Sequence, residues 1–181
     1  MYDFMLRIIP SILISKKRLV KGIKFDNHKD CGDPIKTCLA YESQNADEIS
    51  IVDLDSYNRE KKEPDFELLE QILNQINTPI SLGGNIVNYE VAKKCIKTGV
   101  DKILFNTGLL DKDLIEKIAS DFGSQCIVAS LDIYENNGKY QILTKDKKNF
   151  DLSIFKDHFY LDTVGEFKLT FVDREGNKKW F

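Results

Sequence analysis

The chain has 181 residues, 42% of them hydrophobic, and a formal net charge of -3 at pH 7. These values suit a single globular domain over residues 1–181. The 26 Lys and Arg residues are balanced by 29 Asp and Glu residues, so no basic field indicates binding to nucleic acid or to a membrane surface.

The four cysteines are widely spaced without a Cys-x-x-Cys pair, so we expect reduced thiols in the cytoplasm rather than disulfides. We expect no metal and no cofactor. The apolar stretch over 5–14 is interrupted by Arg7 and Pro10, and it is too short to span a bilayer.

Short apolar segments alternate with amphipathic segments, which is typical of repeated βα units around a parallel sheet. Strands are predicted, in chain order, over 6–13, 49–54, 79–82, 102–105, 125–131 and 166–172. Helices are predicted over 33–45, from residue 64 through Ile76, over 88–98 and 111–122, with a weak one over 151–160. Asn136-Asn137-Gly138 predicts a small hairpin after the fifth strand.

Six evenly spaced strands favour a barrel over a doubly wound sheet. The Gly-x-Gly-x-x-Gly turn of a dinucleotide-binding fold is also missing after the first strand. The predicted fold class is therefore α/β, of the (β/α)8 TIM-barrel type. Because a complete barrel needs about 250 residues, we expect this one to be incomplete at its C-terminal end by the last two βα units.

Functional residues of such barrels lie at the carboxyl ends of the strands. Gly83-Gly84-Asn85 follows the third strand and Asn106-Thr107-Gly108 follows the fourth. Glycine lets a backbone approach a ligand closely, and amides with short polar side chains can bind an anion. These two turns are either a phosphate site or ordinary glycine-containing turns.

Carboxylates end two other strands. Asp132 ends the fifth strand, where it could act as a general acid or base, or only as a capping or surface residue. Asp53 and Asp55 end the second strand as paired acids or as polar rim. Lys21, in a long loop after the first strand, could bind a phosphate or simply face solvent.

The starts of the strands carry a different set of charges, Arg7, Glu48, Lys102 and Glu166, which we call the charged ring. Buried charges are costly unless they are paired. Alternating signs from four strands could satisfy one another around the barrel axis. Alternatively, all four could be solvated charges.

Several motifs in fixed order extend over almost the whole chain and resemble one family, the cyclase subunit of imidazole glycerol phosphate synthase. They are Arg7-Ile8-Ile9-Pro10, Leu19-Val20-Lys21-Gly22, Gly32-Asp33-Pro34, Ala46-Asp47-Glu48, Asp101-Lys102 with Asn106-Thr107, Phe122-Gly123-Ser124-Gln125-Cys126 and Asp173-Arg174.

The resemblance implies a (β/α)8 barrel that binds a glutaminase subunit at its base. Ammonia from the glutaminase would pass a charged gate, which matches Arg7, Glu48, Lys102 and Glu166, and travel along the axis. At the top it would react with a phosphorylated small-molecule substrate, a phosphoribosyl-formimino ribonucleotide.

By the same resemblance, Lys21, Gly84, Asn106 and Thr107 match substrate and phosphate positions. Asp132 matches one of two catalytic acids. Asp101 matches a residue on the side that faces the glutaminase.

The chain also departs from the family pattern. Leu13 stands where the second catalytic acid is expected, and a leucine cannot exchange a proton, so cyclisation would lose a factor of about 10²–10⁴ in rate. Asn85 replaces the third glycine of the phosphate turn. Leu13, together with the segment over 63–68, resembles a paralogous branch that accompanies a glutaminase and a sugar amidotransferase in surface-polysaccharide pathways.

Three hypotheses follow. The barrel relays ammonia to a sugar amidotransferase, or it is a working cyclase of histidine biosynthesis, or it is a truncated paralogue without catalytic activity. The retained charged ring together with Leu13 favours the first.

Overall fold

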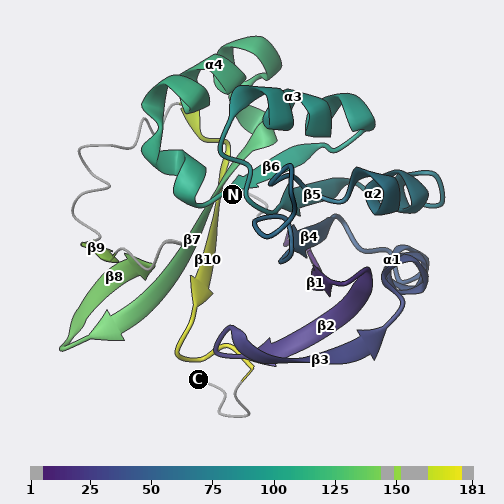
Figure 1. Ribbon diagram of the computed structural model, residues 1–181, viewed down its shortest axis with the longest axis horizontal. Helices are drawn as coiled ribbons and strands as arrows, with labels where there is room; N and C mark the ends of the chain where they lie inside the picture. Colours follow the sequence, from purple (N-terminus) through teal and green to yellow (C-terminus); the bar gives the residue numbers. More distant parts are fainter. Residues whose placement is uncertain (1–5, 144–148, 152–162, 177–181) are drawn as a thin grey trace, which may run out of the picture.

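The computed structural model describes residues 6–143, 149–151 and 163–176, and strands alternate with helices along it (Figure 1). Six strands run parallel in the order β1 (Ser11–Ser15), β4 (Ile49–Asp53), β5 (Ile80–Gly83), β6 (Lys102–Phe105), β7 (Ile127–Asn136) and β10 (Glu166–Phe171). The α/β fold of the TIM-barrel type that the sequence predicts is confirmed. Of the predicted helix over 151–160, Asp151 is the last residue of strand β9 (Asn149–Asp151), and the rest lies outside the described residues.

Four helices lie along the outer side of this sheet: α1 (Pro34–Ser43), α2 (Phe66–Leu73), α3 (Tyr89–Thr98) and α4 (Lys112–Phe122). Two short 3-10 turns, η1 (Thr107–Leu110) and η2 (Ser124–Cys126), flank α4. Figure 1 shows the four helices following one another around the strands, which puts the apolar core between the two layers. Among the described residues, no helix has the length and apolar character needed to cross a bilayer.

The helices begin where the sequence predicts, because each start carries a capping side chain. The carboxylates of Asp33, Asp65 and Asp111 accept hydrogen bonds from backbone N–H groups in the first turns of α1, α2 and α4. Asn88 does the same for α3, and Gly99 ends that helix at a φ of 114°. These local bonds satisfy N–H groups that have no partner within the helix.

The first strand is displaced from its predicted range of 6–13 and starts only at Ser11. The residues before it are connected to the chain segment ahead of β4, since Ile8 donates its N–H to the Asp47 carboxylate at 2.6 Å. Pro10 has no N–H to donate, which is consistent with a strand that begins after it.

The prediction of a long loop after the first strand is wrong. This segment forms an antiparallel hairpin of β2 (Arg18–Ile23) and β3 (Asp26–Gly32), and β2 pairs with β1. The predicted hairpin after the fifth strand is confirmed: β7 continues to Asn136 and pairs with β8 (Lys139–Leu143), followed by β9 (Asn149–Asp151). Asn137 and Gly138 form its turn with φ values of 51° and 75°.

Strand alternation divides β4 into two faces. Ile49 and Ile51 are 0% and 1% exposed and pack in the core with the helices. Glu48 and Ser50 therefore face the other way, into the space that the six parallel strands surround. Several polar residues of the candidate site face this interior.

Candidate functional site in the barrel interior

The charged ring is formed by four ion pairs at the amino-terminal ends of the strands. Lys102 Nζ lies 2.6 Å from Glu48 Oε2 and 2.7 Å from Glu166 Oε1. Arg7 contacts the same two carboxylates at 3.4 Å and 2.8 Å. Positive and negative groups therefore alternate around the ring, and the two carboxylates each have two cationic partners.

Pairing outweighs burial in setting the protonation of the ring. Burial alone would lower the pKa of Lys102, but its hydrogen bonds to Glu166 and Glu48 raise that pKa. Burial would likewise raise the pKa of Glu166, but the hydrogen bonds from Arg7 and Lys102 lower it. Arg7, Lys102 and Glu166 thus keep their charges at neutral pH, held by their pairs within the ring.

A second polar layer, formed by Lys168, Ser11 and Ser50, lies above the charged ring and was not predicted from the sequence. Lys168 is two residues beyond Glu166 on β10, so both face inward. Its amine donates hydrogen bonds to Ser50 Oγ at 2.9 Å and to Ser11 Oγ at 3.0 Å. The alternation Glu166, Lys168, Thr170 along a parallel strand is the sequence signal that could have revealed it.

Asp132 lies further along the inner face of β7, next to Asn106 at the end of β6. Asn106 Nδ2 donates to Asp132 Oδ2 at 3.1 Å and to the Ser130 carbonyl at 3.0 Å. Burial raises the pKa of Asp132 to about 6, and the charge of Lys168 opposes this shift. A carboxyl group that titrates near neutral pH can both take up and release a proton there.

Leu13 occupies the position where the family resemblance implies a second acid. It lies on β1 between Ser11 and Ser15, on the face opposite to the buried Ile12 and Ile14. The structure therefore directs an apolar side chain, and no carboxylate, into the interior from this strand.

The first of the two glycine-containing turns leaves no room for a side chain at its second glycine. Gly84 has a φ of 140°, and a Cβ there would lie 2.8 Å from the Asp53 carbonyl oxygen, so only glycine fits. The following Asn85 uses its side chain to donate to the Lys62 carbonyl at 2.8 Å. Here the turn is packed against the loop that follows β4.

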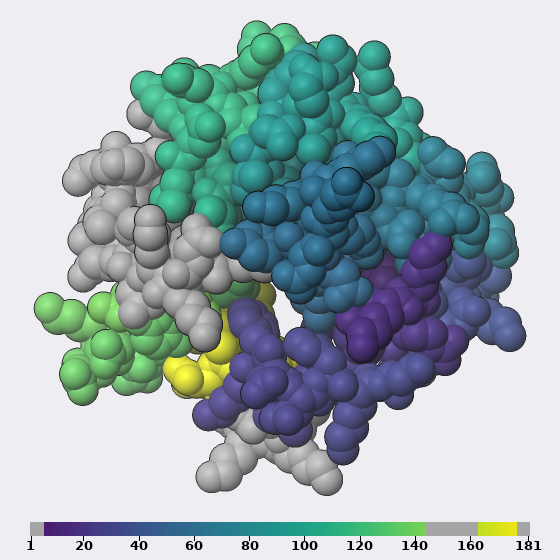
Figure 2. Space-filling view, viewed as in Figure 1, coloured from purple at the N-terminus to yellow at the C-terminus, as the bar shows by residue number. Residues whose placement is uncertain are grey.

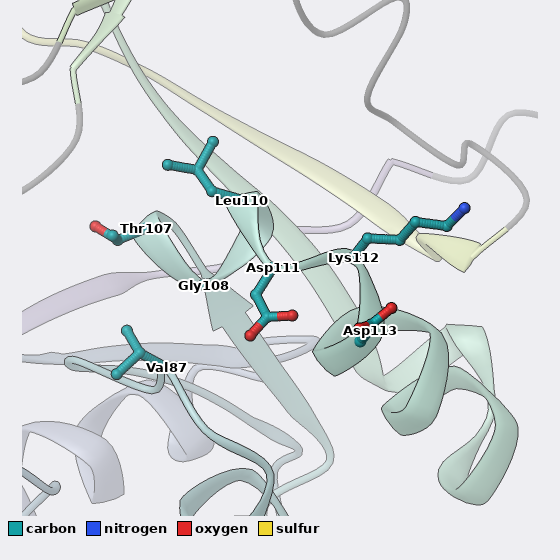
Figure 3. Close-up of a pocket in the computed structure, with 7 residues that line it drawn as sticks. All are labelled: Val87, Thr107, Gly108, Leu110, Asp111, Lys112 and Asp113. Atoms are coloured by element: carbon teal, nitrogen blue, oxygen red, sulfur yellow. The ribbon is translucent and has the colours of Figure 1, made fainter.

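Thr107 lines a shallow surface hollow with Val87, Gly108 and the residues 110–113 (Figure 3). In Figure 3 the Thr107 hydroxyl points away from the Asp111 carboxylate, which caps α4 by accepting from Leu114 N–H at 3.0 Å. Two carboxylates, Asp111 and Asp113, lie in this hollow together with a single cation, Lys112.

Lys21 and Asp101 lie apart from the interior. Lys21 is an exposed residue of β2, paired in register with Lys29, so its predicted place in a long loop is wrong. Asp101, just before β6, accepts a hydrogen bond from Ile80 N–H at 2.9 Å and holds the start of β5.

The paired acids after β4 have separate structural partners. Asp53 accepts from Arg59 at 2.5 Å and from the N–H of Asp65 at 2.9 Å, while Asp55 accepts from the Ser15 hydroxyl at 3.0 Å. Neither acid of this pair contacts Asp132. They hold the loop between β4 and α2 to the end of β1.

Fold and site together define a (β/α)-barrel protein with a charged ring at one end of its axis and an ionisable acid at the other. The chain belongs to the histidine biosynthesis protein family, whose model matches residues 7–180. It is 33% identical to the imidazole glycerol phosphate synthase subunit HisF of Bacillus velezensis and 34% identical to that of Pyrococcus furiosus. It is also 34% identical to a Pseudomonas aeruginosa protein named as subunit hisF2 of the same synthase. Each match covers 97% of this chain and 71% of the relative.

Proposed function

We propose that this single-domain barrel binds a glutaminase subunit in the cytoplasm and passes glutamine-derived ammonia to a sugar amidotransferase. The observation that carries the proposal is the contrast between the two ends of the interior. The charged ring is complete and fully paired. At the opposite end the ionisable acid Asp132 is kept, and Leu13 stands where the family resemblance implies the other catalytic acid.

A relay needs an entrance but no cyclisation chemistry. Ammonia is small and uncharged. The charged ring is a layer of ions that excludes apolar molecules, and its four ion pairs hold it closed. Displacing the Lys102 ammonium would open one side of the ring. In this proposal Glu48 and Glu166 hold Lys102 in place until the partner binds below the ring.

The first test is a pull-down with the tagged full-length chain from cells that carry its gene. Recovery of a glutaminase together with a sugar amidotransferase is the expected result. Recovery of a glutaminase alone would favour the cyclase, and recovery of neither would overturn the proposal.

The second test concerns the charged ring. In the reconstituted complex, Lys102→Ala should lower glutamine-dependent amidation at least tenfold and leave amidation driven by ammonium salts unchanged. Lys112→Ala is the matched control, since Lys112 is a half-exposed surface lysine paired with Glu116 at 3.4 Å. Equal glutamine-dependent rates for the two variants would contradict the role of the ring.

A working cyclase of histidine biosynthesis is the second candidate, and the hydrogen bond from Asn106 to Asp132 favours it. Its substrate would be the phosphoribosyl-formimino ribonucleotide, held at Lys21, Gly84, Asn106 and Thr107. Turnover of this compound with ammonium salts by the chain would establish the cyclase, and we expect none because Leu13 cannot exchange a proton.

A further inference from the structure

The side chain of Lys168 crosses the interior of the barrel. The parallel strands follow the order β1, β4, β5, β6, β7, β10, so β10 and β1 stand at opposite ends of the row. Lys168 starts on β10, yet its amine bonds Ser11 on β1 and Ser50 on β4. Its side chain therefore reaches across from one end of the row of parallel strands to the other.

Two hydroxyl oxygens hold the Lys168 amine in this position. Within the described ranges 6–143 and 163–176, no carboxylate oxygen lies within 4.0 Å of its Nζ, so the amine has hydroxyl acceptors instead of an ion-pair partner. Burial lowers the pKa of Lys168, while the charges of Asp132 and Glu48 oppose that change. Ser50 itself is 2% exposed.

We propose that Ser11 and Ser50 form an ammonia-binding station on the barrel axis, which Lys168 occupies with its own amine. The inference deepens the proposed function and rests on it for its biological purpose. Ammonia and ammonium offer the same N–H donors as the lysine in a smaller molecule. The station lies directly beyond Glu166 of the charged ring, where ammonia that has entered would arrive.

Occupation by Lys168 makes the station a second point of control. The side chain closes the axis while its amine is bound to the two serines. Ammonia must displace the amine to move on, and a lysine has four rotatable side-chain bonds with which to withdraw. Figure 2 shows a central hollow beside the visible part of β10, bordered by the β2–β3 hairpin and the loop after β4.

The test uses the full chain alone, with ammonium chloride as the probe. Lys168→Ala removes the amine and leaves both hydroxyls, so its melting temperature should rise by about 3 °C in ammonium chloride over sodium chloride at equal ionic strength. The wild-type chain should show no such difference. Lys168→Met, which fills the same space without N–H donors, should show none either.

Two further variants make the test specific. Lys168→Ala combined with Ser50→Ala should lose the response to ammonium. No ammonium-specific shift in folded Lys168→Ala would overturn the station, as would a shift of the same size in potassium chloride, since potassium has no N–H groups to donate.

A separate measurement covers the case in which Lys168→Ala does not fold. Ser50→Ala in the otherwise native chain frees the amine, so acetylation of Lys168 by acetic anhydride should be several-fold faster, measured by mass spectrometry against Lys112. An unchanged ratio would overturn the station. Because neither measurement needs a partner, a failed pull-down together with an ammonium response would reject the relay and leave the station standing.

Discussion

Asp132 and Lys168 share the barrel interior, and burial drives each of them toward its neutral form. The pKa of the acid is raised to about 6 and the pKa of the base is lowered, while attraction between their charges opposes both shifts. With a pKa of about 6, Asp132 can therefore change protonation near neutral pH.

The raised pKa of Asp132 predicts a specific dependence of stability on pH. In the unfolded chain this carboxyl ionises near 3.8, but in the folded chain it keeps its proton to about 6. Its contribution to the free energy of unfolding is thus complete below about pH 4 and is lost as the pH rises to about 6, by up to about 3 kcal/mol.

Urea unfolding of the native chain and of Asp132→Asn from pH 4 to pH 7 checks this. The difference in unfolding free energy between the two should shrink as the pH rises through this window. A difference that stays constant would mean that Asp132 has an ordinary pKa.

At the scale of elements, the two N-terminal hairpin turns carry residues that do not usually form such turns. Lys16 and Lys17 have φ values of 51° and 59°, and Lys24 and Phe25 have 51° and 63°. Turns of two residues with positive φ favour Asn and Gly. The second turn is held instead by distant contacts, since Lys24 N–H donates to the Glu175 carbonyl at 3.1 Å and Phe25 N–H to the Glu175 carboxylate at 3.3 Å.

The double variant Lys24→Asn with Phe25→Gly should therefore be more stable than the native chain. Both backbone N–H donors remain, while the cost of the left-handed conformation, about 1–2 kcal/mol for an ordinary residue, is reduced. We expect the free energy of unfolding, measured with urea, to increase by about 1 kcal/mol. Lys139→Asn is a suitable control because it changes an exposed strand residue beside the Asn137-Gly138 turn and should have little effect.

At the scale of the whole molecule, contacts across the interior connect the two ends of the row of parallel strands. Arg7 precedes β1 and pairs with Glu166 of β10 at 2.8 Å, and Lys168 bonds Ser11 of β1. Beyond β10, Glu175 binds the hairpin attached to β1. Polar contacts at three levels therefore link β10 to the strand and hairpin at the opposite end.

Gly176 allows the contact between Glu175 and the β2–β3 hairpin. Alanine at Gly176 should therefore destabilise the chain more than alanine at Gly138. It has a φ of 67°, and a Cβ would lie 2.5 Å from the Gly22 carbonyl oxygen and 2.9 Å from Ile23 Cα. Gly138 has a similar φ of 75° but nothing within 4 Å of a Cβ.

Gly138→Ala should lower the free energy of unfolding by about 1 kcal/mol, and Gly176→Ala should lower it by at least twice as much. Gly176→Ala should also separate the hairpin from the loop after β10. Urea unfolding measures the two costs. Hydrogen exchange at the Lys24 amide should become faster in Gly176→Ala alone, and equal effects of the two variants would show that the contact contributes nothing.

The amino-acid sequence is enough to predict the order of the parallel strands and the four helices, the places where those helices begin and the charged residues at the starts of the strands. These features depend on hydrophobic periodicity and on hydrogen bonds between residues close in the chain, as at Asp33 and Asn88. The family resemblance then matched the four grouped charges to a gate.

The contacts of Lys168 with Ser11 and Ser50, and those of Glu175 with the hairpin after β1, form only in the folded chain. Lys168 is 118 residues away from Ser50, and Glu175 is 150 residues away from Phe25. Partners so far apart leave no local pattern, because they meet only after the strands have curved around a common interior. For the same reason the turn at Lys24 and Phe25 adopts a conformation that its own residues do not favour.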